Sequence, residues 1–74
     1  MKITIEFCEP CGYRPRAQAA AARLKEKAGA EVELIKGHGG VFEITVDGAL
    51  KFSKKATGRF PSEAELDALA KDSR

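Results

Sequence analysis

The sequence predicts an α/β fold of order β-α-β-β-β-α, in which two helices cover a mixed four-stranded sheet. Three observations predict it. Four short segments alternate apolar and polar residues with the period of a half-buried strand. A segment rich in strong helix formers lies between the first two of them, and a capped helical pattern follows the fourth. A strand, helix, strand unit makes a right-handed crossover, so the first two strands should be parallel.

The first strand is predicted at residues 2–7 and the first helix at residues 15–28. Pro15 suits the first helical position, and its ring disfavours a helical conformation at Arg14. The helix is rich in alanine, so it can pack closely against the sheet. Gly29 is placed to cap its C-terminus in the left-handed conformation.

Three further strands complete the predicted sheet, at residues 31–35, 41–46 and 49–53. A glycine-rich loop at residues 37–40 joins the first two. Asp47 and Gly48 are a strong two-residue hairpin signal, because both turn positions need a positive φ. The last two strands should therefore be antiparallel. Leu50 and Phe52 lie on one face of a regular strand, and we expect both to point inward.

A basic loop is predicted at residues 54–61, before the last helix. Ser62 and Glu65 match a capping box, in which the serine bonds forward and the glutamate reaches back. Two leucines spaced three apart then give this helix a short apolar stripe. The tail, residues 71–74, is expected to fray.

The length of 74 residues predicts a single domain over residues 1–74. With 43% apolar and 32% charged residues, the chain has the composition of a soluble globular protein. Its net charge of +2 is too small to indicate a nucleic-acid partner. No apolar segment reaches the roughly 20 residues that cross a bilayer, and none at the N-terminus resembles a signal peptide. We therefore expect a cytoplasmic protein that binds no membrane.

The chain's two cysteines, Cys8 and Cys11, lie between the first strand and the first helix. This is the layout of thioredoxin-like redox sites. A bridge between them closes a very short loop, so a purely structural disulfide is disfavoured. Two inert buried thiols are one alternative. A zinc site is another, but zinc takes four ligands, and beside these thiols the chain offers a single histidine, His38. We predict no bound metal and no cofactor.

Four segments of the chain resemble the selenoprotein W-like (Rdx) family, which includes selenoproteins T, W and H. Residues 7–13, Phe-Cys-Glu-Pro-Cys-Gly-Tyr, are similar to the family's opening, where Cys-x-x-Cys or Cys-x-x-selenocysteine is followed by Gly-Tyr. Residues 40–44 with the Asp-Gly turn, residues 52–55 and residues 58–61 are similar to later segments, in the family's order and spacing. The chain resembles a cysteine-containing member, because Cys11 stands where selenoproteins hold selenocysteine.

The resemblance implies a thioredoxin-like fold and a thiol-based oxidoreductase or antioxidant role. Thiol or disulfide proteins, or glutathione, are the partners it implies. Cysteine at the selenocysteine position implies slower chemistry than selenium gives. The loop before Val41 is glycine, where ordinary thioredoxins carry a cis-proline, and this departure weakens the inference of general disulfide reductase activity.

A free thiol is only about 3% thiolate at pH 7, so a reactive cysteine needs a lowered pKa. The positive end of the predicted helix and the nearby Arg14 and Arg16 can stabilise a thiolate. Cys11 lies nearer to this helix than Cys8, and the resemblance also places the reactive atom at the second position. We therefore expect Cys11 to attack and Cys8 to resolve. The alternative is attack by Cys8, as in ordinary thioredoxins.

Four residues are candidates for contact with a substrate: Gly12, Tyr13, His38 and Gly40. Tyr13 follows the thiol turn, although packing beside the helix start explains it equally well. A thioredoxin-like fold would bring the glycine loop near the thiols, where His38 can shuttle a proton or simply be exposed.

Two other functions stay open beside thiol–disulfide exchange. One is a redox-sensitive protein-interaction module without turnover, and the other is a metal-binding subunit. A basic cluster can attract an acidic partner or the carboxylates of glutathione, although most such clusters are only solvated. Its members are Lys51, Lys54, Lys55 and Arg59.

Overall fold

The computed structural model describes residues 2–72 and confirms the predicted α/β fold with a mixed four-stranded sheet. The elements are β1 (Lys2–Cys8), α1 (Arg14–Ala28), β2 (Glu31–Gly37), β3 (Phe42–Val46), β4 (Ala49–Ser53), α2 (Lys54–Thr57) and α3 (Glu63–Asp72). The short helix α2 lies inside the segment predicted to be a basic loop. Within the described residues, no helix has the length and apolar character needed to cross a bilayer.

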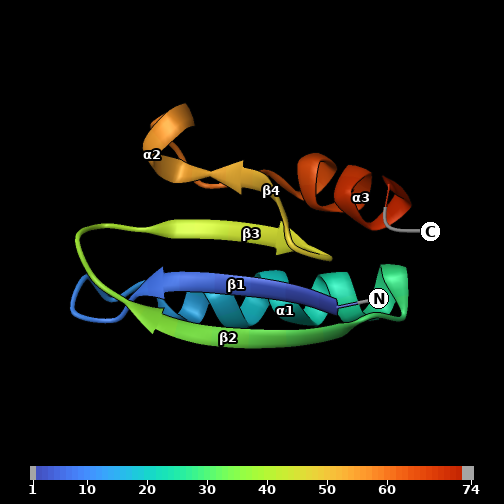
Figure 1. Cartoon of the computed structure of the whole chain (residues 1–74), viewed down its shortest axis with the longest axis horizontal. Helices are drawn as coiled ribbons and strands as arrows, with labels where there is room; N and C mark the ends of the chain where they lie inside the picture. The colour runs from blue at the N-terminus through green and yellow to red at the C-terminus, as the bar shows by residue number, and fades with distance from the viewer. Residues whose placement is uncertain (1, 73–74) are drawn as a thin grey trace.

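The strand order in the sheet is β2-β1-β3-β4 (Figure 1). The central strand β1 runs parallel to β2, as the crossover rule predicts, and antiparallel to β3. Ile5 is paired with Leu34 on one side and with Ile44 on the other. The thiol segment leaves the end of this central strand, so it is held by pairing on both sides.

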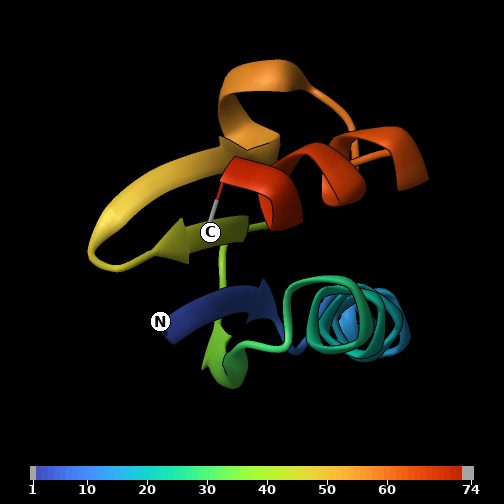
Figure 2. The same ribbon diagram turned by 90° about the vertical axis from the view of Figure 1, so that its right-hand side faces the viewer.

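Both longer helices, α1 and α3, pack on the same face of the sheet (Figure 2). The inward residues of β1 are Ile3, Ile5 and Phe7, and each is at most 1% exposed. Small side chains on α1 meet them, which lets the helix lie close to the strands. The remaining members of this core cluster come from every layer: Ala17, Ala20, Ala21, Leu24, Phe42, Ile44, Val46, Phe52, Leu66, Leu69 and Ala70.

A two-pronged ion pair joins α3 to α1. Nε and Nη2 of Arg23 donate to the two carboxylate oxygens of Asp67, at 2.8 and 3.0 Å. This hydrogen bonding raises the pKa of Arg23 and lowers the pKa of Asp67. Arg23 also lies 3.8 Å from a carboxylate oxygen of Glu63. The orientation of α3 over α1 is therefore fixed by charge as well as by apolar packing.

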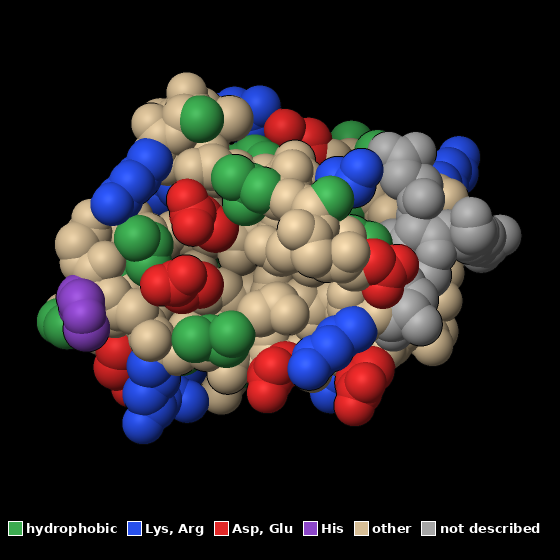
Figure 3. All heavy atoms as spheres, in the orientation of Figure 1, with side chains coloured by type: hydrophobic (Ala, Val, Ile, Leu, Met, Phe, Trp, Pro, Cys, Tyr) green, Lys and Arg blue, Asp and Glu red, His purple; other side chains and the backbone are tan. Residues whose placement is uncertain are grey.

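The opposite face of the sheet is open and carries acidic and apolar side chains (Figure 3). Leu50 lies here, 57% exposed, so the expectation that it points inward is wrong. A register shift in the β3–β4 pair explains the difference. Phe52 is opposite Ile44, but Leu50 is opposite Thr45, because Lys51 is left out of the pairing. Residues directly opposite share a face, so this bulge turns Leu50 outward while Phe52 stays in the core.

Several predicted boundaries move by one or two residues. Helix α1 begins at Arg14, so Pro15 lies inside the first turn and Arg14 is helical, contrary to expectation. The preference against a helical residue before proline is a bias rather than a prohibition, and first-turn N–H groups need no helical partner. Gly29 has φ +63° and caps the helix through an N–H bond to the Lys25 carbonyl, as predicted.

The C-terminal helix follows its predicted signals. The Ser62 N–H donates to Glu65 Oε1 at 2.9 Å, and the Glu65 N–H donates to Ser62 Oγ at 3.2 Å, which confirms the capping box. Helix α3 includes Lys71 and Asp72, two of the four residues expected to fray. The other two, residues 73–74, lie outside the described residues.

Candidate functional site

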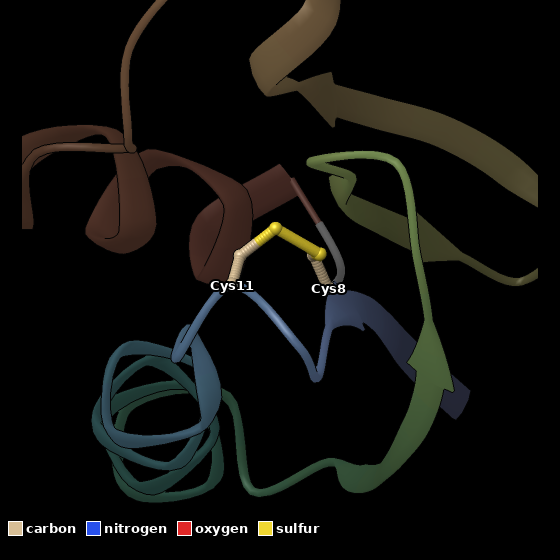
Figure 4. Close-up of a disulfide and its surroundings, with 2 residues drawn as sticks. All are labelled: Cys8 and Cys11. Atoms are coloured by element: carbon tan, nitrogen blue, oxygen red, sulfur yellow. A yellow bond between two sulfur atoms is a disulfide. The ribbon is translucent and has the colours of Figure 1, made fainter.

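Cys8 and Cys11 form a disulfide at the junction of β1 and α1 (Figure 4). Cys8 is the last residue of the central strand, and Cys11 lies in the turn that leads to the helix. Their Cα atoms are 5.3 Å apart, well inside the range that a disulfide spans. The two sulfurs therefore lie together, as the Cys-x-x-Cys spacing predicts.

A compact backbone turn holds the two cysteines in this position. The Gly12 N–H donates to the Glu9 carbonyl at 3.1 Å, and the Tyr13 N–H donates to the Cys8 carbonyl at 3.4 Å. Gly12 has φ +78°, a left-handed conformation that costs glycine little and other residues more. Gly12 therefore shapes the turn that redirects the chain from strand to helix.

The two sulfur-bearing residues differ strongly in exposure. Cys8 is 1% exposed, and its backbone N–H is bonded to the Val41 carbonyl at 2.8 Å. Cys11 is exposed on the surface of the turn. A molecule approaching the disulfide therefore meets Cys11 first.

The N-terminus of α1 lies directly after the thiol turn. Its N-cap residue is Tyr13, and no side chain of the described residues caps the helix. Its first turn holds no acidic residue, while Arg14 and Arg16 stand within it. The positive end of the helix dipole therefore remains available to a negative charge on the neighbouring Cys11.

Glu9, inside the thiol turn, forms an ion pair with Arg14. Nη2 and Nε of Arg14 donate to Glu9 Oε1 at 2.7 and 3.1 Å. This hydrogen bond lowers the pKa of Glu9, with further help from the charges of Arg14 and Lys36. The other carboxylate oxygen, Oε2, is buried and has no hydrogen-bond partner among the described residues. The sequence analysis did not predict this ion pair. The acidic residue between the cysteines was the one sign of it in the sequence.

Tyr13 packs on an aromatic cluster beside the helix start. Its ring centroid is 4.8 Å from that of Phe60, edge to face, and Phe60 stands 5.2 Å from Phe42 in the same manner. Phe60 thereby links the thiol turn to the core. Of the two interpretations of Tyr13, packing is confirmed, and contact with a substrate stays a prediction.

The loop between β2 and β3 is held against the thiol turn, as the sequence predicts. The Glu9 N–H donates to the Gly37 carbonyl at 3.1 Å, and the bond from Cys8 to Val41 fixes the other end. His38 is exposed in this loop, and Gly40 is half-buried with φ +78°. Both candidates therefore lie in a segment beside the cysteines, and their contact with a substrate stays a prediction.

The predicted basic cluster is divided in the structure. Lys54 lies over the rings of Tyr13 and Phe60, with Nζ 5.6 and 5.3 Å from their centroids. Arg59 is paired with Glu65, which raises its own pKa and helps to lower that of Glu65 to about 2. Lys54 therefore lies beside the thiol turn, whereas the charge of Arg59 is paired with Glu65. Among the described residues, no three histidine, cysteine or carboxylate side chains gather closely enough to hold a metal ion.

Comparison with known proteins places this geometry in a family. The model of the Rdx family matches residues 2–72. "Migration and invasion enhancer 1" of Bos taurus is 42% identical over 67 residues, which are 89% of this chain and 58% of that protein. The Mus musculus protein of the same name is 42% identical over 65 residues, 86% of this chain and 56% of its own length. The chain thus spans a little more than half the length of these curated relatives.

Two crystal structures share the whole fold. A selenoprotein W-related protein from Vibrio cholerae superposes with a TM-score of 0.90 at 27% identity, covering 96% of this chain and 92% of that one. A protein from Bordetella parapertussis gives a TM-score of 0.89 at 35% identity, covering 96% and 94%. The fold is therefore the thioredoxin-like fold of the selenoprotein W-related proteins. By the family match and these similarities together, the chain belongs to the Rdx family.

Proposed function

We propose that this chain is a thiol–disulfide redox protein, in which Cys8 and Cys11 alternate between a dithiol and a disulfide. One observation carries the proposal: the two sulfurs lie at bonding distance where a buried strand meets a helix N-terminus. A bond in that position can open and close without rearrangement of the core. Membership of the Rdx family supports the same function.

In the proposed cycle, the Cys11 thiolate attacks one sulfur of a disulfide substrate. A bond forms between Cys11 and that sulfur, and the other half of the substrate leaves as a thiolate and takes up a proton. Cys8 then loses its proton and attacks Cys11, which forms the internal disulfide and releases the second substrate thiol. Two electrons pass from the protein to the substrate, and an external thiol donor restores the dithiol.

The assignment of Cys11 as the attacking residue rests on access and charge. Cys11 is exposed, whereas Cys8 is 1% exposed. To be half ionised at pH 7, a thiol with a pKa of about 8.5 needs a shift of about 1.5 units, or about 2 kcal/mol. A helix N-terminus supplies about 0.3–1 kcal/mol at exposed sites and up to about 2 kcal/mol in favourable ones. Because Cys11 is exposed, the uncapped start of α1 supplies a part of the requirement, and the exposed Arg16 adds to it.

Thiol or disulfide proteins, or glutathione, are the proposed partners. Such a partner would reach Cys11 across the surface formed by Gly12, Tyr13 and the loop that carries His38 and Gly40. Gly12 and Gly40 expose backbone rather than side chains there, which allows an extended polypeptide to come close.

Trapping of mixed disulfides tests this function. The variants Cys8→Ser and Cys11→Ser are each reduced and incubated with cell extract, and covalent adducts are resolved without reductant. We expect Cys8→Ser to accumulate adducts, because attack occurs but resolution does not. Adducts on Cys11→Ser alone would reverse the roles of the two cysteines. A lack of adducts on both variants would refute dithiol exchange.

A further inference from the structure

A groove of about 360 Å³ lies between α1 and the segment that leads into α3. Its apolar lining includes Ala20 and Phe42, both buried in the core, and Leu66 of α3. Phe60 forms another part of the lining, and the exposed Ala19 stands at the rim. This volume is at the lower end of the range of ligand pockets, about 300–1,000 Å³. The groove therefore suits one or two side chains rather than a large cofactor.

The charges at the groove are not equivalent. Arg23 is already bound by Asp67 and lies near Glu63. Arg16 is exposed, and its guanidinium carbon lies 4.2 Å from the Phe60 ring centroid. No carboxylate of the described residues pairs with Arg16. The groove thus combines an apolar interior with Arg16, a cation that has no anionic partner among the described residues, while the other charged lining residues, Arg23 and Glu63, lie 3.8 Å from each other.

The groove is connected to the thiol turn through the start of α1 and through Phe60. Arg16 belongs to the first turn of α1, which begins directly after the thiol turn. Phe60 lines the groove on one side and touches Tyr13 on the other, 4.8 Å between ring centroids. A polypeptide bound covalently at Cys11 can therefore extend along the helix start into the groove.

We propose that this groove selects the polypeptide partners of the dithiol. The preferred segment carries its disulfide-bonded cysteine close to an apolar side chain, which enters the groove, and to a carboxylate, which pairs with Arg16. This inference rests on the proposed function and adds the chemistry of the substrate to it. The complementarity of charge is what assigns an acidic, apolar segment rather than a basic one.

Single-turnover kinetics with blocked peptides test the inference. Each peptide holds one cysteine as a mixed disulfide with 2-mercaptoethanol, followed at a spacing of two, three or four residues by Leu-Glu, Leu-Gln or Ser-Glu. The dithiol of the protein is oxidised, and the peptide disulfide is reduced to peptide thiol and 2-mercaptoethanol. Bis(2-hydroxyethyl) disulfide serves as a neutral small substrate, and glutathione disulfide as a charged one without an apolar group.

Two pairs of variants test the contribution of the charge and that of the groove separately. Arg16→Ala removes the cation, and Lys25→Ala removes the same charge from the far end of α1. Ala19→Leu fills the groove from its rim, and Ala22→Leu places the same side chain at an exposed position of α1 outside the groove. Ratios between peptides are compared within each variant, so a general change in thiol reactivity cancels.

At the best spacing, we expect wild-type protein to react about 2–5 times faster with the Leu-Glu peptide than with Leu-Gln, the range of an exposed ion pair. We expect the rate with the Leu-Glu peptide to be about 5–20 times the rate with the Ser-Glu peptide, because one leucine is partly buried. Arg16→Ala should bring the ratio of the Leu-Glu rate to the Leu-Gln rate to about one. Ala19→Leu should bring the ratio of the Leu-Glu rate to the Ser-Glu rate to about one. Both ratios should keep their wild-type values in the control variants.

Equal rates on all three peptides in wild-type protein would overturn the inference and leave the proposed function intact. A second result would also overturn the inference: Arg16→Ala slows the reaction with glutathione disulfide as much as that with the Leu-Glu peptide, and Ala19→Leu changes no ratio. The surface would then be a site for small anions. Failure of reduced wild-type protein to react with any of these disulfides would refute the proposed function itself.

Discussion

Truncation of Phe60 is the most informative test of how the thiol turn is supported. The Phe60 ring contacts Tyr13 at 4.8 Å and Phe42 at 5.2 Å between centroids, both edge to face. It also receives the guanidinium of Arg16 and the ammonium of Lys54. Phe60→Ala removes a side chain that contacts the turn, the helix start and the core.

The expected magnitude follows from these contacts. Truncation of a fully buried phenylalanine costs about 3–5 kcal/mol. Phe60 is half-buried, so roughly half of that range applies, about 1.5–2.5 kcal/mol. Each edge-to-face pair is worth about 0.5–1.5 kcal/mol beyond burial, although part of it is already counted in truncation data. We therefore expect a loss of about 2–3 kcal/mol in the free energy of unfolding.

Urea unfolding followed by circular dichroism measures this loss. For a domain of this size, with a slope near 1 kcal/mol per molar urea, the midpoint should fall by about 2–3 M. The control is Leu50→Ala, which removes an exposed side chain from the open sheet face and should cost less than about 0.5 kcal/mol. Equal and small losses for both variants would refute the role that we assign to Phe60.

Three further predictions concern the turn, the last helix and the glycine loop. Glu9→Gln removes the negative charge inside the thiol turn and frees Arg14, so Cys11 in a Cys8→Ser background should be alkylated faster at pH 7. Glu65→Gln should destabilise the fold at neutral pH, because the pKa of Glu65 is lowered from 4.5 to about 2. A depressed pKa stabilises the fold above the unfolded value, so the difference from wild type should shrink as the pH falls from about 4.5 towards 2. Gly37→Ala should cost about 1–3 kcal/mol in urea unfolding, because its Cβ would come within 2.8 Å of the Val41 side chain.

Two of these predictions have a control variant, and the third is checked by its pH dependence. Glu26→Gln makes the same charge change at an exposed position of α1 far from the thiols, and an equal effect on alkylation would contradict the role of Glu9. A gap between Glu65→Gln and wild type that stays constant down to pH 2 would contradict the pH argument. Gly48→Ala tests a glycine that, unlike Gly37, has positive φ and open space around it, so strain alone is measured there.

The fold was largely predictable because local and global signals agree. The alternation in β1, the alanine-rich helix and its Gly29 cap each specify one element, and the crossover rule then fixes the parallel pair. The Ser62–Glu65 capping box predicted the start of α3 for the same reason. These are short-range interactions, and short-range patterns in a sequence report them directly.

The outward position of Leu50 was not predictable from alternation alone. Its orientation depends on the bulge that leaves Lys51 out of the β3–β4 pairing. A bulge is a property of two paired strands, and it reverses the face of the sheet on which each residue beyond it is expected to lie. The extension of β2 to Gly37 has a similar origin, since its pairing with Cys8 on the neighbouring strand continues the ladder.

The candidate site likewise combines local features, which could be predicted from the sequence, with long-range features, which could not. The spacing of Cys8 and Cys11, and their place before a helix, could be read from the sequence because both are local. The groove could not, because its walls come from α1, β3, α3 and the segment before α3, joined through Phe60. The orientation of the Glu9 carboxylate towards Arg14 likewise depends on the geometry of the folded turn.

Equilibration of the protein in a series of glutathione redox buffers tests the central claim most directly. The dithiol and disulfide fractions are counted by alkylation and mass spectrometry. We predict a single reversible transition with the slope of a two-electron couple, reached equally from the reduced and the oxidised protein, and absent in Cys11→Ser. A thiol content that does not change across the series, or that changes only irreversibly, would contradict a redox role for this cysteine pair.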